Sequence, residues 1–187
     1  MGVVMEMTFD WHGHTFPLFD HPYNLTVQNE RAVEIPVAQQ FVRQPGVGLE
    51  VGNVLSHYQH VAHRVVDLHE TAPNVDNIDL FDIDGHYDWC VAISTVEHVR
   101  WDFTPRDPDG AAAAIAHLRS IADRLLVTVP LGYHRPLDNQ IRSGELEPAR
   151  DCVMVRDRDR WVQQTRRTWR PYGMSTLWAE AVWIGEW

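Results

Sequence analysis

The segment from Leu49 to His57 holds residue types that suit ligand binding at the end of a strand. Glu50 and Gly52 close an apolar run, and a helix-like segment follows directly. A glycine lets the backbone approach a ligand that a side chain would exclude, and the start of a helix offers unpaired N–H groups to polar ligand atoms. This spacing is typical of a nucleotide-binding turn, and a plain tight turn between a core strand and a helix has the same pattern.

Histidines and aromatic residues gather near the N-terminus, where residues 8–28 are interrupted by glycine and proline. The pattern predicts a short hairpin or an irregular cover over the main fold. His12 and His14 would point the same way on a strand, but further ligands are not evident, so we expect no metal. Trp11 and His14 are candidate substrate contacts, because such side chains can stack on a ring or sugar; covering the core is the alternative.

Arg156 to Arg170 is the one concentration of basic residues. Aspartates alternate with its first arginines, which favours a solvated, salt-bridged face; a clamp for a phosphate or carboxylate is the alternative. The whole chain has 26 acidic and 16 basic residues, for a net charge of −10. This excess would repel a phosphate backbone, so we expect a small-molecule substrate and no nucleic acid.

Length and composition indicate an ordinary globular protein. The chain has 187 residues, of which 44% are hydrophobic and 22% charged. No apolar run reaches the roughly 20 residues that cross a bilayer, and the start lacks a secretion signal, so we expect a cytoplasmic protein without a membrane partner. Two cysteines exclude a disulfide framework. We expect one domain over 1–187, with a cover at 1–28 and a core at 29–187, as a monomer or homodimer.

Apolar runs alternate with amphipathic segments along the core, which indicates a parallel sheet covered on both faces. Strands are expected at residues 47–52, 64–68, 87–95 and 125–130, and helices at 54–62 and 111–124. An earlier helix, capped by Asn29 and ending before Pro45, should be kinked or divided at Pro36.

The C-terminal part has a different pattern. Strand-like runs at 152–155, 161–165 and 178–184 are separated by turns and not by helices, so we expect an antiparallel edge. Residues 134–150 read as a loop. Together with the N-terminal cover, this loop is expected on the substrate side.

Five blocks in this order resemble the class I S-adenosylmethionine-dependent methyltransferases, and more narrowly small methyltransferase-like proteins with a Leu-Glu-Val-Gly-Asn-Val-Leu-Ser-His-Tyr turn. The blocks are residues 49–58, 65–68, 78–80, 87–88 with 93–99, and 127–132. The resemblance implies an α/β fold, a Rossmann-like three-layer sandwich whose mostly parallel sheet has an antiparallel C-terminal edge. It also implies S-adenosylmethionine as cofactor and methyl transfer to oxygen or nitrogen of a small polar molecule, for example a saccharide.

The resemblance places the cofactor beyond the carboxyl ends of the strands. Glu50 and Gly52 would face its methionine half, Gly52 by close backbone approach and Glu50 by accepting from the ammonium group or by ordering the loop through water. Asp67 would accept both ribose hydroxyls, with Glu70 as the competing residue, and Asp79 would accept from the adenine amino group. The third strand of the family corresponds to residues 78–80. The cofactor-binding residues implied in this way are Glu50, Gly52, Asn53, Asp67, Leu68, Asp79, Leu80, Ser94 and Glu97.

The loop from Ser94 to Val99 would lie under the transferred methyl group. His98 is the candidate general base, because an imidazole can take a hydroxyl proton near neutral pH. The same histidine could instead line the cofactor. Tyr133 and His134 follow the next strand and are candidate substrate contacts. Methyl transfer depends mainly on in-line positioning, so a dedicated base is not required.

The sequence departs from the family pattern in two places. Gly52 is the only glycine of the turn, and Asp67 to Asp79 is too short for a full crossover helix, so the third strand must be short or reached by an extended loop. A non-catalytic binding or scaffold protein of the same fold is therefore the alternative function. A nicotinamide-dependent dehydrogenase is disfavoured because Gly-x-Gly-x-x-Gly is absent.

Overall fold

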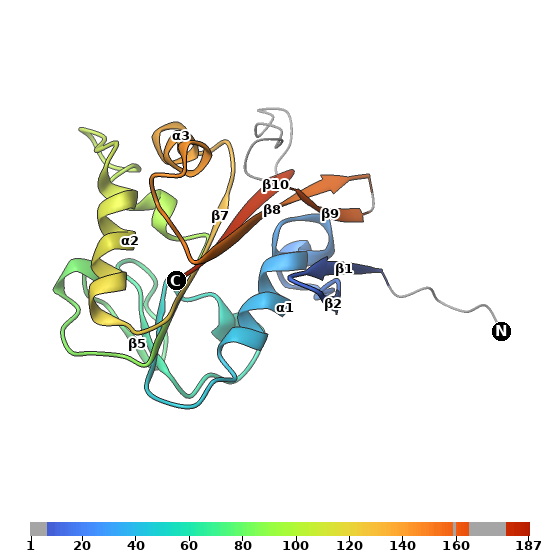
Figure 1. Cartoon of the computed structure of the whole chain (residues 1–187). Helices are drawn as coiled ribbons and strands as arrows, with labels where there is room; N and C mark the ends of the chain where they lie inside the picture. The colour runs from blue at the N-terminus through green and yellow to red at the C-terminus, as the bar shows by residue number, and fades with distance from the viewer. Residues whose placement is uncertain (1–6, 159, 165–178) are drawn as a thin grey trace.

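Figure 1 shows the computed structural model, in which an eight-stranded sheet runs through the molecule. The structure describes residues 7–158, 160–164 and 179–187. The strand order is β5-β4-β3-β6-β7-β10-β8-β9. The strands are β3 (Gly48–Val51), β4 (Arg64–Val66), β5 (Val75–Asp76), β6 (Trp89–Ile93), β7 (Leu125–Pro130), β8 (Arg150–Asp157), β9 (Arg160–Gln164) and β10 (Ala181–Glu186).

The first five strands of this order are parallel, and β10, β8 and β9 continue the sheet with antiparallel pairs. β6 is buried along its whole length because both faces are covered. Cys90 and Ala92 pack on the side of helices α2 (Gly110–Ile121) and α3 (Arg135–Ser143), whereas Val91 and Ile93 pack toward α1 (Arg31–Phe41). The expected Rossmann-like three-layer sandwich, with its antiparallel C-terminal edge, is confirmed.

The N-terminal segment covers the α1 face. β1 (Thr8–Trp11) and β2 (His14–Pro17) form the expected hairpin, and a 3₁₀ helix, η1 (Tyr23–Gln28), follows. Phe9 and Trp11 belong to the same buried cluster as α1. Beyond the hairpin, the Phe19 N–H donates to the Ala32 carbonyl oxygen at 2.9 Å.

That contact explains why α1 is not divided at Pro36. Proline has no N–H, so it cannot satisfy the Ala32 carbonyl four residues earlier. The cover segment supplies the missing donor, and the helix runs on to Phe41. The predicted cap is close to the observed one: the Asn29 side chain accepts from the Arg31 N–H at 3.0 Å.

Three predicted elements were wrong. Residues 54–62 form only a short 3₁₀ helix, η2 (Leu55–His57), because a buried carboxylate takes the N–H groups that would begin a longer helix. The third strand is Val75–Asp76 and not 78–80. It is short, as expected from the few residues that connect it to β4. Residues 134–150 contain α3, whose signals were Leu137 and Ile141 one turn apart and Gly144 at the C-terminus.

Among the described residues, none of the helices is long and apolar enough to cross a membrane. The strands predicted at 161–165 and 178–184 are confirmed within the described range, where β9 ends at Gln164 and β10 begins at Ala181. Arg166, Arg167 and Arg170 lie outside the described residues. Nothing is therefore concluded about the arginine clamp.

Candidate functional site

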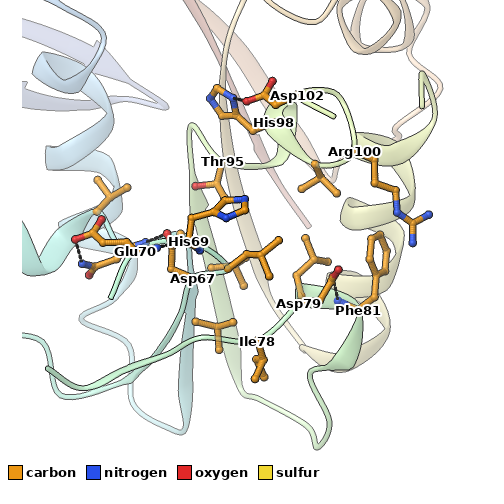
Figure 2. Close-up of a pocket in the computed structure, with 18 of the residues that line it drawn as sticks. Asp67, His69, Glu70, Ile78, Asp79, Phe81, Thr95, His98, Arg100 and Asp102 are labelled. Carbon is orange, nitrogen blue, oxygen red and sulfur yellow. Dashed lines mark hydrogen bonds and ion pairs between the residues drawn. The ribbon is translucent and has the colours of Figure 1, made fainter. Parts of the chain in front are cut away.

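A cavity of about 510 Å³ opens at the carboxyl ends of β3, β4 and β6. Here the chain passes from β3 to β4 on one side and later returns with β6 on the other, which is where open α/β sheets bind ligands. Figure 2 shows side chains of all three loops around it. Its lining residues are Val51, Gly52, Asn53, Val54, Val66, Asp67, Leu68, His69, Glu70, Ile78, Asp79, Leu80, Phe81, Ser94, Thr95, His98, Val99, Arg100, Asp102 and Phe103.

Gly52 brings two loops of the cavity together. Its φ is +83°, and a Cβ at this position would lie 2.0 Å from the Thr95 Oγ1. A left-handed backbone and such a close approach both require glycine. The residue therefore lets the β3 loop pack against the β6 loop at the edge of the cavity.

Glu50 does not line the cavity. It is fully buried, and its Oε1 accepts from the N–H groups of Val54 at 2.9 Å and Leu55 at 2.7 Å. Its Oε2 lies 2.8 Å from the His63 Nε2. Both oxygens hold the loop in place by direct bonds, so the structure places Glu50 in the loop-ordering role and not in the cavity lining.

Asp67 and Glu70 both reach the cavity, and both also bind protein groups. Asp67 accepts from the N–H groups of Asn53, His69 and Glu70 at 2.7–3.0 Å. Burial alone would raise the pKa of Asp67, but these three bonds together hold the pKa below its ordinary value. The Glu70 carboxylate accepts from the Asn53 amide at 2.7 Å and lies 3.0 Å from the His57 Nε2. The ribose role of Asp67, with Glu70 as the alternative, stays a prediction.

One end of the cavity is apolar and suits a flat ring. Ile78, Leu80 and Phe81 line it, and the Arg100 guanidinium lies 4.3 Å from the Phe81 ring centroid. The Asp79 Oδ1 accepts from the Phe81 N–H at 3.0 Å, which leaves Oδ2 for a ligand. The predicted adenine contacts of Asp79 and Leu80 remain predictions, now placed on a wall of the cavity. Leu68 also lines the cavity and is 47% exposed.

His98 lies at the opposite end of the cavity from Phe81 and is held by a carboxylate (Figure 2). Its Nδ1 lies 2.8 Å from the Asp102 Oδ2, and the Tyr133 hydroxyl donates to the Asp102 Oδ1 at 2.5 Å. Burial would raise the pKa of Asp102, but the bonds from Tyr133 and His98 outweigh it and lower that pKa. Burial and the bond to Asp102 raise the pKa of Tyr133 to about 12, so Tyr133 stays a hydrogen-bond donor.

Sequence reasoning missed Asp102, although a signal was present. His98 and Asp102 are four residues apart, the spacing at which side chains on a helical turn meet. The arrangement of an imidazole held by a carboxylate fixes which ring nitrogen carries the proton. It therefore strengthens the case for His98 as a base, a role that stays a prediction.

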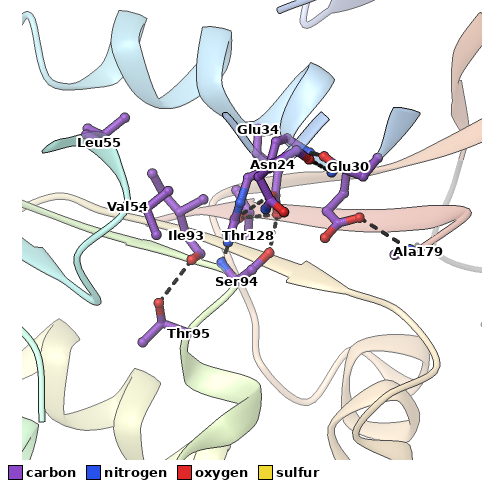
Figure 3. Close-up of polar contacts among 12 residues, drawn as sticks. Asn24, Glu30, Glu34, Val54, Leu55, Ile93, Ser94, Thr95, Thr128 and Ala179 are labelled. Carbon is purple, nitrogen blue, oxygen red and sulfur yellow. Dashed lines mark hydrogen bonds and ion pairs between the residues drawn. The ribbon is translucent and has the colours of Figure 1, made fainter. Parts of the chain in front are cut away.

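Ser94 connects the cavity to a polar cluster under α1. Its hydroxyl donates to the Glu34 Oε1 at 2.6 Å, and the Thr128 hydroxyl donates to the same oxygen at 2.7 Å. Arg31 donates from Nη1 to the Glu34 Oε2 at 2.7 Å. Figure 3 shows Ser94, Thr128 and Glu34 converging at the ends of β6 and β7. The Ser94 hydroxyl is thus engaged, although the residue lines the cavity as predicted.

Glu97 is fully buried on the 3₁₀ helix η4 (Val96–His98) and does not line the cavity, and its predicted contact with the cofactor stays a prediction. Neither of its oxygens has a hydrogen-bond partner within the described part of the chain. Burial raises the pKa of Glu97 well above its ordinary value. Burial thus disfavours the charged form of this carboxyl.

The four predicted substrate contacts do not line the cavity. His134 is fully buried; its Nδ1 accepts from the Leu137 N–H at 3.0 Å, so it caps α3. Trp11 packs in the core near Arg150, which pairs with Glu186 beside the amino end of β7. His14 is the register partner of Trp11 on the same hairpin, away from the cavity.

Tyr133 does not line the cavity but lies next to a residue that does. Its side chain is 41% exposed beside the cavity-lining His98, with ring centroids 4.8 Å apart. A substrate contact at Tyr133 remains a prediction. Within the described residues, no group of three or more His, Cys, Asp or Glu side chains is arranged to hold a metal ion.

No protein-family model matches the chain, and no curated protein matches it in sequence. Among solved structures, the magnesium protoporphyrin IX methyltransferase of Synechocystis with bound SAM is 14% identical, covering 86% of this chain and 77% of its own, with a TM-score of 0.44. A Thermoplasma acidophilum protein is 14% identical over 81% of this chain and 84% of its own, with a TM-score of 0.46. DhpI, in complex with SAM and HEP, is 16% identical over 82% and 85%, with a TM-score of 0.37. Such distant likenesses carry no functional argument.

Proposed function

We propose that this chain is an S-adenosylmethionine-dependent methyltransferase that acts on oxygen or nitrogen of a small molecule. One observation carries the proposal: a cavity of about 510 Å³ at the topological switch point, with an apolar end, a polar middle and an imidazole at the far end. Ligand sites of this fold class lie at that position, and the volume falls in the usual range for small-molecule sites.

The residues present fit the cofactor part by part. Ile78, Leu80 and Phe81 suit the adenine ring, and the free Oδ2 of Asp79 suits its amino group. Asp67 and Glu70 suit the ribose hydroxyls. When bound, the cofactor supplies an electrophilic methyl group on a sulfonium.

The chain's own residues then position and deprotonate the acceptor. Asp102 accepts the proton on Nδ1 of His98, so the neutral imidazole presents an unprotonated Nε2. That nitrogen takes the proton that the attacking oxygen or nitrogen must lose. The apolar side chains of Val99 and Phe103 line the same cavity.

One observation favours the second candidate, a binding protein of this fold without methyl transfer. The N–H groups of Asn53, Val54 and Leu55 all donate to protein carboxylates. The β3 loop therefore offers fewer free donors to a cofactor carboxylate than a glycine-rich turn would.

Calorimetry with S-adenosylhomocysteine and S-adenosylmethionine tests the cofactor. We expect binding, and we expect Asp67→Ala to weaken it by about 1–3 kcal/mol, the usual loss for a missing buried polar partner. Unchanged affinity in Asp67→Ala would transfer the ribose role to Glu70. The exposed Glu145→Gln serves as the matched control.

Cofactor binding tests whether the site exists, and turnover distinguishes a methyltransferase from a non-catalytic binding protein. No heat from either nucleoside would reject the proposal. Binding without transfer of labelled methyl to any acceptor in a broad panel of alcohols, phenols and amines would favour the non-catalytic alternative.

A further inference from the structure

A cluster of charged residues lies between the start of α1 and the ends of β6 and β7. It consists of Glu30, Arg31, Glu34 and Glu97, and we refer to it as the acidic cluster. Three carboxyl groups face one guanidinium there, and the electrostatic interactions of Glu97 include all three other members. Figure 3 shows Glu30 and Glu34 of this cluster above Ser94 and Thr128.

The members of the acidic cluster differ in how their oxygens are used. Glu34 is fully buried and accepts from Arg31, Ser94 and Thr128, so its charge is paired and both oxygens are bonded. The Glu30 Oε2 accepts from the Ala179 N–H at 3.3 Å. Glu97 is equally buried but has no hydrogen-bond partner in the described part of the chain.

Glu97 lies next to the end of the cavity where methyl transfer is proposed. The Glu97 Oε1 is 3.6 Å from the His98 Nε2, which is too far for a hydrogen bond but close enough for an electrostatic interaction. His98 itself lines the cavity. Glu97 does not itself line the cavity, so a ligand that contacts the His98 Nε2 would reach the Glu97 carboxyl only with a shift of the His98 side chain.

The charge of the acidic cluster indicates what kind of ligand could bind the Glu97 carboxyl. A buried carboxyl without a donor is costly, and natural structures pair such groups with a cation, a donor or a metal. A metal is disfavoured because no suitable group of three ligands exists among the described residues. An anionic ligand would add to an excess of carboxyl groups. A ligand that brings its own N–H donors and a positive charge would satisfy this carboxyl and offset the excess of carboxyl groups.

We propose that Glu97 binds the amino group of the methyl acceptor, and hence that the acceptor is a small-molecule amine. This inference rests on the proposed function. The Tyr133 ring next to His98 and the Phe103 side chain elsewhere in the cavity lining, which are 41% and 51% exposed, offer aromatic surface for the apolar body of such an amine.

The reaction balances with the residues described. The acceptor enters as an ammonium ion and loses one proton to the His98 Nε2. The nitrogen lone pair then forms a bond to the methyl carbon of the sulfonium donor, and the carbon–sulfur bond breaks with its electron pair left on sulfur. The products are a methylated ammonium ion held by Glu97, S-adenosylhomocysteine, and a protonated His98 that releases its proton to solvent.

The test compares ligands of matched shape and different charge. Calorimetry on the protein saturated with S-adenosylhomocysteine would use phenethylamine, phenethyl alcohol and phenylacetate, and a second series of cyclohexylamine, cyclohexanol and cyclohexanecarboxylate. We expect an amine to bind roughly tenfold or more tightly than its alcohol, as a charged hydrogen bond implies, and the carboxylates to bind most weakly. Glu97→Gln should reduce the amine preference to less than about threefold, whereas Glu145→Gln should keep it.

The possible outcomes distinguish failure of the proposed function from failure of the amine assignment. Failure to bind S-adenosylhomocysteine would reject the proposed function and this inference with it. Normal binding of that nucleoside without an amine preference in either series, or without measurable binding of any probe, would reject the inference alone. An amine preference that persists in Glu97→Gln would also overturn it. Because the wild-type series does not depend on a variant, a Glu97→Gln protein that fails to fold leaves the test intact.

Discussion

Asp67 and Glu97 both follow strands at the carboxyl edge of the sheet, and their surroundings are opposite. Asp67 accepts three backbone N–H groups, which lower its pKa despite partial burial. Glu97 is fully buried without a partner in the described chain, and burial raises its pKa. The comparison teaches that a carboxylate bonded to backbone builds a loop, whereas an unbonded buried carboxyl is available to a ligand.

The largest effect on stability should come from the β3 loop, where Gly52 packs too closely against Thr95 to accept a side chain. Gly52→Ala combines a φ of +83° with a Cβ 2.0 Å from the Thr95 Oγ1, so we expect a loss of about 3–5 kcal/mol in the free energy of unfolding. Binding of S-adenosylhomocysteine should be lost as well. Urea denaturation and calorimetry measure the two effects.

Gly13→Ala is the matched control for this strain. Gly13 has a φ of +80°, but nothing lies within 4 Å of its Cβ position. It should lose only about 1–2 kcal/mol, the cost of the left-handed backbone alone. Equal losses at the two glycines would show that contact between the β3 and β6 loops contributes nothing.

The next prediction contrasts two buried glutamates directly. Glu50→Ala strands the N–H groups of Val54 and Leu55, so we expect it to destabilise by about 2–4 kcal/mol. Glu97→Gln removes no hydrogen bond and should leave stability within about 0.5 kcal/mol at pH 4.5. A large loss in Glu97→Gln at that pH would contradict the description of Glu97 as unpartnered.

The free energy of unfolding should also depend on pH differently in the wild type and in Glu97→Gln. The pKa of Glu97 is raised in the folded protein, so above the ordinary value of 4.5 the unfolded chain releases a proton that the folded chain keeps. The wild type therefore loses stability relative to Glu97→Gln as pH rises from 4.5 toward the folded pKa. Urea denaturation of both proteins from pH 4.5 to 8 measures the difference, and a constant difference would refute the raised pKa.

Much of the fold could be predicted from periodicity, because the central strands are buried on both faces and read as continuous apolar runs. β3, β6, β7 and α2 were placed within a few residues. The helix predicted at 54–62 is absent because the Glu50 carboxylate, four and five residues earlier, takes the N–H groups of Val54 and Leu55, and the apolar pattern does not reveal where that side chain points. α3 was missed because its apolar stripe is short, although Gly144 marked its end.

The site was harder to predict than the fold. Sequence order correctly brought Gly52, Asp67, Asp79 and Ser94 to one cavity, because strand ends of a parallel sheet share an edge. It could not tell an acid that faces the cavity from one buried behind it, as with Glu50 and Glu97. It also placed Trp11 and His14 on the substrate side, since nothing in the sequence indicates on which end of the sheet a hairpin packs.

A smaller effect is expected at the carboxylate that orients His98. Asp102→Ala removes the acceptor of the Nδ1 proton, so nitrogen NMR of the histidines should show His98 shifting toward the Nε2–H tautomer. With an amine acceptor, kcat should fall roughly 10–100-fold while affinity for S-adenosylhomocysteine stays within about threefold. An unchanged tautomer would remove Asp102 from the positioning role. Tyr133→Phe, which keeps the carboxylate, is the control and should have the lesser effect.

The smallest effect should come from the hairpin. His14→Ala alters an exposed side chain whose neighbour Trp11 packs near Arg150, beside the amino end of β7 and thus across the sheet from the cavity. We expect the free energy of unfolding and the affinity for S-adenosylhomocysteine to change by less than about 0.5 kcal/mol. The amine preference should also persist. Loss of that preference in His14→Ala would mean that the hairpin takes part in selecting the acceptor, contrary to its position beside the amino end of β7.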